Sequence, residues 1–254
     1  MAPRIDLNAD VGESLGPWPM GQDDALIPLV TSVNIACGSH AGDPLTMRRT
    51  VRLALSSGAA IGAHPGYPDL IGFGRRDIAM TAEELEASVL AQVAALAGIA
   101  RAEGGILRHV KPHGALYHRA ARDPAVARPI ALAVALVDPG LRLVGPSGSA
   151  LEAAGHEVGL TVMTEGFVDR AYEADGSVRP GLPPGGANSD PAVAAALAVS
   201  IAVRHEVRAA DGTAIAIAVD SICIHGDTPG AVSIARAVRS ALEAADVRVA
   251  APGA

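Results

Sequence analysis

Residues 5–13 read IDLNADVGE, and this stretch contains both the first strand of the predicted fold and its first group of carboxylates. Successive side chains of a β-strand point to opposite faces, so Asp6, Asn8 and Asp10 share one face and the apolar residues between them share the other. A carboxylate that points into a barrel is unfavourable unless it is paired or functional. We therefore expect Asp10 and Glu13, nearer the rim, to act in a site, while a bracing role stays open for Asp6.

Short apolar runs followed by helical stretches recur along the chain, which favours βα units and a parallel sheet. The predicted strands are residues 5–9, 33–37, 60–63, 107–111, 141–144, 160–164 and 222–225. The predicted helices are residues 43–57, 82–103, 124–137, 192–205 and 231–245, and two of them begin with an Asp-Pro pair that is typical of helix starts. This order predicts an α/β fold, a seven-stranded (β/α) barrel.

The chain has 254 residues, a length at which such barrels are commonly one unit, so a single domain over residues 1–254 is predicted. Two segments interrupt the alternation of strands and helices. Residues 167–190 are rich in Gly, Pro and Asp and are too long for an ordinary connection, which indicates an inserted functional loop. Residues 207–219 contain an Asp-Gly turn between two β-like stretches and predict a small hairpin before the last strand.

Composition narrows the class of partner. Half of the residues are hydrophobic but only 2% are aromatic, so the core is built from small aliphatic side chains. A net charge of −7 without a run of Lys and Arg argues against nucleic acid and favours small molecules or proteins. No signal peptide or long uninterrupted apolar run is visible, so we expect a cytoplasmic protein without a membrane contact. Cys37 and Cys223 lie in apolar runs and are expected to pack as reduced thiols.

Polar residues gather where the predicted strands end, and parallel α/β folds collect their reactive groups at that edge. The segments that follow the strands read NADVGE (8–13), CGSH (37–40), HPG (64–66), KPHG (111–114), EG (165–166) and HGD (225–227). We therefore expect six strand ends to meet at one polar mouth.

Lys111 is the only lysine among 20 basic Lys and Arg residues. Because the chain otherwise uses Arg, a single Lys indicates a site that needs a compact ammonium or an amine whose pKa can shift. A chance occurrence is the alternative. Arg75 follows the flexible turn GFG and is suited either to bidentate binding of a carboxylate or phosphate or to a solvated surface. The turn lacks the Lys-Ser/Thr ending of a Walker phosphate loop.

Histidines at strand ends are the main candidates for proton transfer. His40, His64, His113 and His225 each stand beside Gly or Pro at such an end and are expected to be functional, whereas His109 is expected to be a hydrogen-bonded core residue. The remaining three, His118, His156 and His205, are expected at the surface.

Six longer segments resemble the signature blocks of the LamB/YcsF family, the 5-oxoprolinase A subunits. They are IDLNADVGES, NIACGSHAGDP, AIGAHPGYPDLIGFGRR, VKPHGALY, EGFVDRAYEADGSV and ICIHGDTPGA, and they follow one another over almost the whole chain. The resemblance implies a seven-stranded barrel like those of glycoside hydrolases and polysaccharide deacetylases. The chain departs from the family at Ser39, where Phe is usual.

The resemblance also implies an activity: conversion of 5-oxoproline to L-glutamate coupled to hydrolysis of ATP with magnesium, in a complex with B and C subunits. A lactam needs an activated carbonyl, a positioned water and a proton for the departing nitrogen. As a hypothesis, Asp10 or Glu13 is the general base, His64 or His113 supplies the proton, and Lys111 stabilises the oxyanion or a phosphoryl group. Substrate or nucleotide contacts are expected from Asp6, Asn8, His40, His225 and Asp227, with Arg75 or Arg170 binding the substrate carboxylate.

Two other interpretations stay open. In a metal-dependent deacetylase-like hydrolase, Asp10, His64 and His113 would hold a divalent ion that activates water. In a third class, the chain is a binding or scaffolding component without catalysis of its own. The sequence leaves open whether the protein itself binds a metal.

Overall fold

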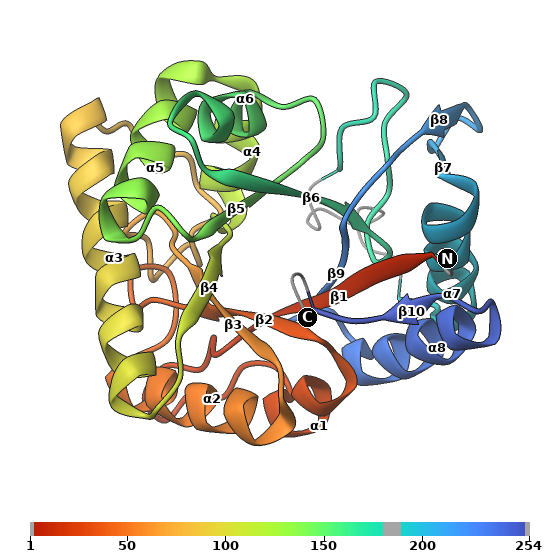
Figure 1. The fold of residues 1–254 in the computed structure, drawn as a ribbon, viewed down its shortest axis with the longest axis horizontal. Helices are drawn as coiled ribbons and strands as arrows, with labels where there is room; N and C mark the ends of the chain where they lie inside the picture. Colours follow the sequence, from red (N-terminus) through yellow and green to blue (C-terminus); the bar gives the residue numbers. More distant parts are fainter. Residues whose placement is uncertain (1–2, 180–188, 252–254) are drawn as a thin grey trace.

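Seven parallel strands form the centre of the computed structural model, which describes residues 3–179 and 189–251 (Figure 1). They are β1 (Arg4–Val11), β2 (Ser32–Ala36), β3 (Ala60–His64), β4 (Leu107–Val110), β5 (Arg142–Gly145), β6 (Thr161–Phe167) and β9 (Ser221–His225). Each pairs in parallel with the next, and β9 pairs with β1, which closes the ring. The predicted seven-stranded (β/α) barrel is confirmed. A short strand, β10 (Arg248–Val249), pairs with the start of β1.

Helices cover the outside of this ring (Figure 1). They are α1 (Asp23–Leu26), α2 (Pro44–Ser57), α3 (Ala82–Ala102), α4 (Gly114–Arg122), α5 (Pro124–Val137), α6 (Ala150–Glu157), α7 (Pro191–Val199) and α8 (Ala231–Ala244), and α7 continues through a π-helical turn at Ser200–Arg204. The predicted Asp-Pro starts are real caps, because the Asp43 side chain accepts hydrogen bonds from the second and third residues of α2 and Asp123 accepts one in α5. Helices α1, α4 and α6 were absent from the sequence-based prediction.

The two faces of β1 divide as the alternation predicts. Leu7 and its apolar neighbours point outward into the hydrophobic layer between strands and helices. Asp6 points the other way and accepts hydrogen bonds from the hydroxyls of Thr31, Ser32 and Ser221. These contacts satisfy the buried carboxylate at the lower end of the barrel and agree with a bracing role.

The two predicted interruptions have different outcomes. The predicted hairpin corresponds to the antiparallel pair β7 (Glu206–Arg208) and β8 (Ala214–Ala216), which begins one residue before the predicted range of 207–219. Of the inserted loop, residues 180–188 lie outside the described part. Residues 171–179 form a turn in which Tyr172 pairs with Val178.

Among the described residues, α3 is the one helix whose length and hydropathy would let it cross a membrane. A third of its most apolar window is buried within the fold. The buried side includes Leu85, Val89, Val93 and Leu96, which belong to the hydrophobic core. These side chains pack one side of α3 against the barrel.

Close packing inside the barrel predicts a large effect of a single methyl group at Gly62. A Cβ there would overlap the imidazole of His109, which is fully buried on the neighbouring strand. We expect Gly62→Ala to lower the free energy of unfolding by about 1–3 kcal/mol, the usual range for overpacking. Gly98→Ala in α3, where a Cβ meets no atom within 4 Å, is the matched control and is expected to be neutral or slightly stabilising. Urea unfolding measures both; equal midpoints for the two variants would contradict the packing argument.

Candidate active site

The carboxyl ends of the strands surround a pocket with a volume of about 460 Å³. Seven of the residues predicted from sequence line it: Asp10, His64, Arg75, Lys111, His113, Arg170 and His225. Glu13 and His40 are buried behind this wall beside His113, and Asp227 pairs with Arg75 at the rim. Asp6 and Asn8 lie deeper in the barrel, where Asn8 donates a hydrogen bond to Ser221. His118, expected at the surface, is half-buried and lines the pocket.

Lys111 is held by three groups at the bottom of the pocket. Its Nζ lies 3.0 Å from Asp10 Oδ1, 3.0 Å from Glu165 Oε2 and 2.9 Å from Cys223 Sγ. Burial alone would lower the pKa of the amine, but the Asp10 carboxylate and then Cys223 and Glu165 raise it well above its usual value. The Lys111 side chain is therefore a buried, charged ammonium held in a fixed position. In the sequence, Glu165 stood out only because it lies near the end of a predicted strand. Its contact with Lys111 could not be predicted from that position.

Asp10 is the carboxylate that links this ammonium to the histidines. Its burial raises its pKa, but His64 and Lys111 outweigh this and hold the pKa well below the usual value. Its second oxygen, Oδ2, lies 3.3 Å from His64 Nε2 and 3.8 Å from His225 Nε2. Asp10 is thus ionised, and it binds protons weakly.

His225 is oriented by Asp169, a residue that the sequence analysis did not select. Its Nδ1 lies 2.9 Å from Asp169 Oδ1, and the backbone N–H of His225 and the Thr228 hydroxyl donate to Oδ2. Burial raises the pKa of Asp169, but His225 and Arg170 together lower it to about 2. A carboxylate on Nδ1 fixes the tautomer in which Nε2 carries the lone pair, so His225 presents a base to the pocket. The only sequence signal was the position of Asp169, two residues after β6 in the block EGFVDR.

His64 and His113 form a second pair with fixed ring orientations. His64 Nδ1 lies 2.7 Å from the Lys111 carbonyl oxygen, and His113 Nε2 lies 2.8 Å from that of Phe73. Because a carbonyl oxygen only accepts, both of these ring nitrogens carry a proton. Their other nitrogens, His64 Nε2 and His113 Nδ1, face each other at 3.0 Å.

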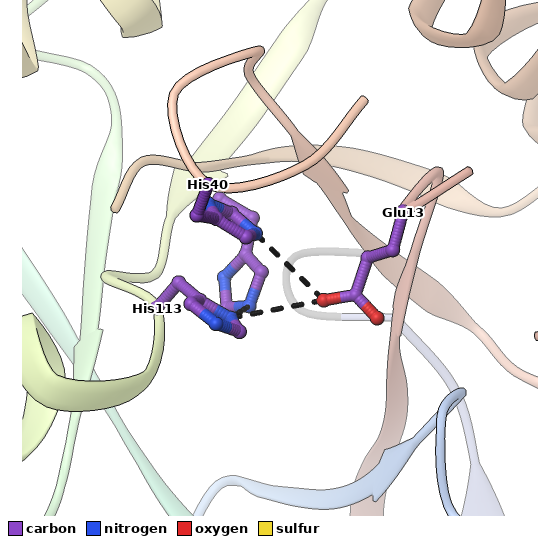
Figure 2. A group of neighbouring side chains, drawn as sticks. Glu13, His40 and His113 are labelled. Carbon is purple, nitrogen blue, oxygen red and sulfur yellow. Dashed lines mark hydrogen bonds and ion pairs between the residues drawn. The ribbon is translucent and has the colours of Figure 1, made fainter. Parts of the chain in front are cut away.

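His40 and Glu13 complete the buried cluster behind this pair. The His40 ring stacks on that of His113 with 3.7 Å between the ring centroids, and both rings point toward the Glu13 carboxylate (Figure 2). Burial, and then the carboxylates of Asp227 and Asp10, raises the pKa of Glu13 well above its usual value. Burial lowers the pKa of His40 and of His113. Glu13 does not line the pocket itself, although its carboxylate faces the rings behind the pocket wall.

Arginines bring positive charge to the rim. The Arg75 guanidinium pairs with Asp227 and lies over the Phe73 ring. Arg170 donates hydrogen bonds to the Asp169 carbonyl and to Thr228. Three further arginines that line the pocket are Arg119, Arg122 and Arg179. The rim therefore suits a ligand with carboxylate or phosphoryl oxygens.

His109 is the hydrogen-bonded core residue that the sequence predicted, with its Nε2 2.8 Å from the Asn34 side-chain oxygen. Burial, and then the Lys111 ammonium, lowers its pKa from 6.5 to about 3. Since this pKa is lower in the folded than in the unfolded chain, the stability from the neutral ring is full above pH 6.5 and is lost as the pH falls toward 3.

This shift predicts that stability decreases in acid. His109→Gln keeps a donor for Asn34 but cannot titrate, so the variant should show a slope of unfolding free energy against pH that is smaller by up to about 1.4 kcal/mol per pH unit. Urea unfolding of both proteins between pH 6.5 and 3 measures this difference. Equal slopes would show that His109 is not a buried neutral ring.

The fold, with a polar pocket at the carboxyl ends of its strands, places the chain in the broad class of α/β barrels. A solved structure of the T48 deacetylase matches over 98% of this chain and 87% of its own, with a TM-score of 0.50 at 16% identity, a likeness of fold alone. The LamB/YcsF family matches residues 5–254, and the chain belongs to this family.

Close relatives carry more specific names. A protein of Methylococcus capsulatus (strain Bath), 55% identical over 253 residues that cover 100% of this chain and 97% of the relative, is named as the A subunit of 5-oxoprolinase. A Thermus thermophilus protein with the same name is 50% identical over 97% of this chain and 98% of its own length. The crystal structure of a lactam utilization protein from Thermus thermophilus matches with a TM-score of 0.92 and 48% identity over 98% of this chain and 100% of that one.

Proposed function

We propose that this chain is the A subunit of an ATP-dependent 5-oxoprolinase, which opens 5-oxoproline to L-glutamate together with B and C subunits in the cytoplasm. The relatives named as A subunits of 5-oxoprolinase support the reaction class. The observation that carries the proposal is the pocket itself, in which a buried ammonium, Lys111, and a carboxylate-oriented histidine, His225, face one cavity.

Opening a lactam is difficult because the amide is resonance-stabilised and its nitrogen leaves poorly. ATP, bound with magnesium in the complex, would activate the carbonyl oxygen by phosphorylation. Water would then attack the ring carbon, the C–N bond would break, and the nitrogen would take up a proton, which leaves an acyl phosphate. A second water would hydrolyse the acyl phosphate, so that each turnover gives glutamate, ADP and phosphate. A pocket for this step needs a base for water, a proton donor for nitrogen and positive charge near the oxygen.

Lys111 supplies the positive charge in this proposal. Its Nζ is fixed between Asp10 and Glu165, so it needs no reorganisation as negative charge develops on the substrate oxygen or phosphoryl group. The compact ammonium of a lysine can contact three partners around a single nitrogen atom. A planar guanidinium cannot do so.

His225 supplies the base. Its Nε2 accepts a proton from water, Asp169 stabilises the resulting imidazolium, and the same nitrogen then gives the proton to the departing ring nitrogen. This assignment replaces the sequence-based expectation that Asp10 or Glu13 is the base, because Asp10 binds protons weakly and Glu13 does not line the pocket.

His64 and His113 remain in the proposal on the electrophilic side of the pocket. Their facing nitrogens require a shared proton or another cation, which adds positive charge near the reacting carbonyl. Arg75 or Arg170 binds the substrate carboxylate, and the other rim arginines favour a phosphoryl group.

The test is an assay of glutamate release from 5-oxoproline by the purified chain, alone and with its B and C subunits, each with and without ATP and magnesium. We expect glutamate only in the complete mixture. In parallel, release of acetate from N-acetylated sugar oligomers tests the deacetylase interpretation. Acetate release together with no glutamate in the complete mixture would overturn the proposal.

A further inference from the structure

The cluster of Glu13, His40, His64 and His113 has polar atoms that the fold itself does not satisfy. Within residues 3–179 and 189–251, Glu13 Oε1 and both ring nitrogens of His40 have no hydrogen-bond partner, although these side chains are at most 5% exposed. Unsatisfied buried polar atoms are rare in native proteins and often mark an ion or a water. Three such atoms in one place point to a bound ligand.

The facing nitrogens of His64 and His113 give independent support. Each ring already donates its one proton to a backbone carbonyl, so two neutral rings would direct two lone pairs at each other across 3.0 Å. That contact is repulsive unless a proton or a metal ion lies between or beside the two nitrogens. A ring N–H given to a carbonyl is also the usual arrangement around a histidine that binds a metal.

The distances fit a metal ion. Glu13 Oε1 lies 3.7 Å from both His40 Nε2 and His113 Nδ1, and all four candidate ligand atoms lie within 4.8 Å of one another. Tetrahedral coordination with bonds near 2.1 Å separates the ligand atoms by about 3.4 Å, so small side-chain movements would complete the shell.

We propose that Glu13, His40, His64 and His113 bind a divalent transition-metal ion, with zinc as the best match. Three imidazole nitrogens and one carboxylate oxygen are ligands that zinc and its neighbours prefer, whereas magnesium and calcium prefer oxygen. Because His64 and His113 line the pocket while Glu13 and His40 do not, the ion lies in the pocket wall and fixes two of its side chains. The site stands independently of the reaction proposed above.

A second group of possible ligands, Asp10, Cys223 and His225, does not compete. The Lys111 ammonium already lies within 3.0 Å of both Asp10 Oδ1 and Cys223 Sγ, and a fixed positive charge there repels a cation. The four-residue cluster has no ammonium or guanidinium hydrogen-bonded to its ligand atoms among the described residues.

The experiment measures the metal content of the full-length chain by mass spectrometry, followed by removal with chelator and calorimetric titration with zinc. We expect one ion per chain, a higher melting temperature on zinc binding, and zinc affinity at least about a hundredfold lower in Glu13→Gln and His40→Gln, since each ligand carries a share of the binding free energy. His156→Gln, an exposed histidine on α6, is the matched control and should bind zinc as the wild type does.

Cobalt substitution of the wild-type chain keeps the test informative if a variant fails to fold. Cobalt bound by nitrogen and oxygen ligands should show visible ligand-field bands. It should lack the intense near-ultraviolet band of a cobalt–thiolate bond. Failure of the stripped wild-type chain to bind zinc would overturn the inference. So would unchanged affinity in both variants, or a thiolate band that places the ion at Cys223.

Discussion

Replacing Lys111 with alanine should reduce turnover of 5-oxoproline in the complete mixture by at least about a hundredfold to a thousandfold, the range seen when one preorganised oxyanion donor is lost. The variant removes the ammonium on which Asp10 and Glu165 converge. Lys111→Arg should fail to a similar degree, because a guanidinium cannot occupy the same three-contact position. The rate of glutamate release at saturating ATP measures both.

Loss of Lys111 also leaves two buried carboxylates without their cation, which destabilises a fold by about 3–5 kcal/mol in comparable cases. Thermal unfolding therefore accompanies the assay, so that only folded protein is compared. Arg101→Ala, on the exposed end of α3, is the control and should keep wild-type turnover. A folded Lys111→Ala protein with turnover within tenfold of the wild type would remove Lys111 from the mechanism.

Asp169→Asn should lower kcat by about a thousandfold, because the residue that orients His225 would no longer fix its tautomer or stabilise its imidazolium. Asp169 touches no reacting atom in this account and is a positioning residue. The KM for 5-oxoproline should therefore change much less than kcat. Asp169→Glu, which keeps the charge, should recover part of the loss.

Steady-state kinetics of the complete mixture separate these effects. Asp24→Asn, an exposed carboxylate of α1, is the matched control and should leave both constants unchanged. Equal losses in kcat and in affinity, together with a lower melting temperature, would point instead to a structural role for Asp169.

The sequence predicted the barrel because its signals are local. Alternation along residues 5–10 separated the polar from the apolar face of β1, and each strand carries its own apolar run. Helix α4 was missed because it begins at Gly114, the last residue of the polar turn KPHG, so the same residues predicted a loop. Helix α6 is only eight residues long and weakly patterned.

The site was less predictable, since it depends on where loops direct side chains after the strands end. Residues at or next to a strand end, such as Asp10, His64 and His225, lie in the pocket as their position suggested. Glu13 stands only two residues beyond β1, yet the loop turns it behind the pocket wall to His40. Asp169 carried no signal beyond its position after β6, because its contact with His225 joins residues 56 apart in the sequence.

The ratio of phosphate to glutamate produced from 5-oxoproline and ATP by the reconstituted complex tests the account most directly. If this chain opens the lactam in an ATP-coupled reaction, one phosphate should appear for each glutamate, and neither product should form at an appreciable rate when this chain or ATP is omitted. Glutamate that forms without ATP, or without this chain, would contradict the account.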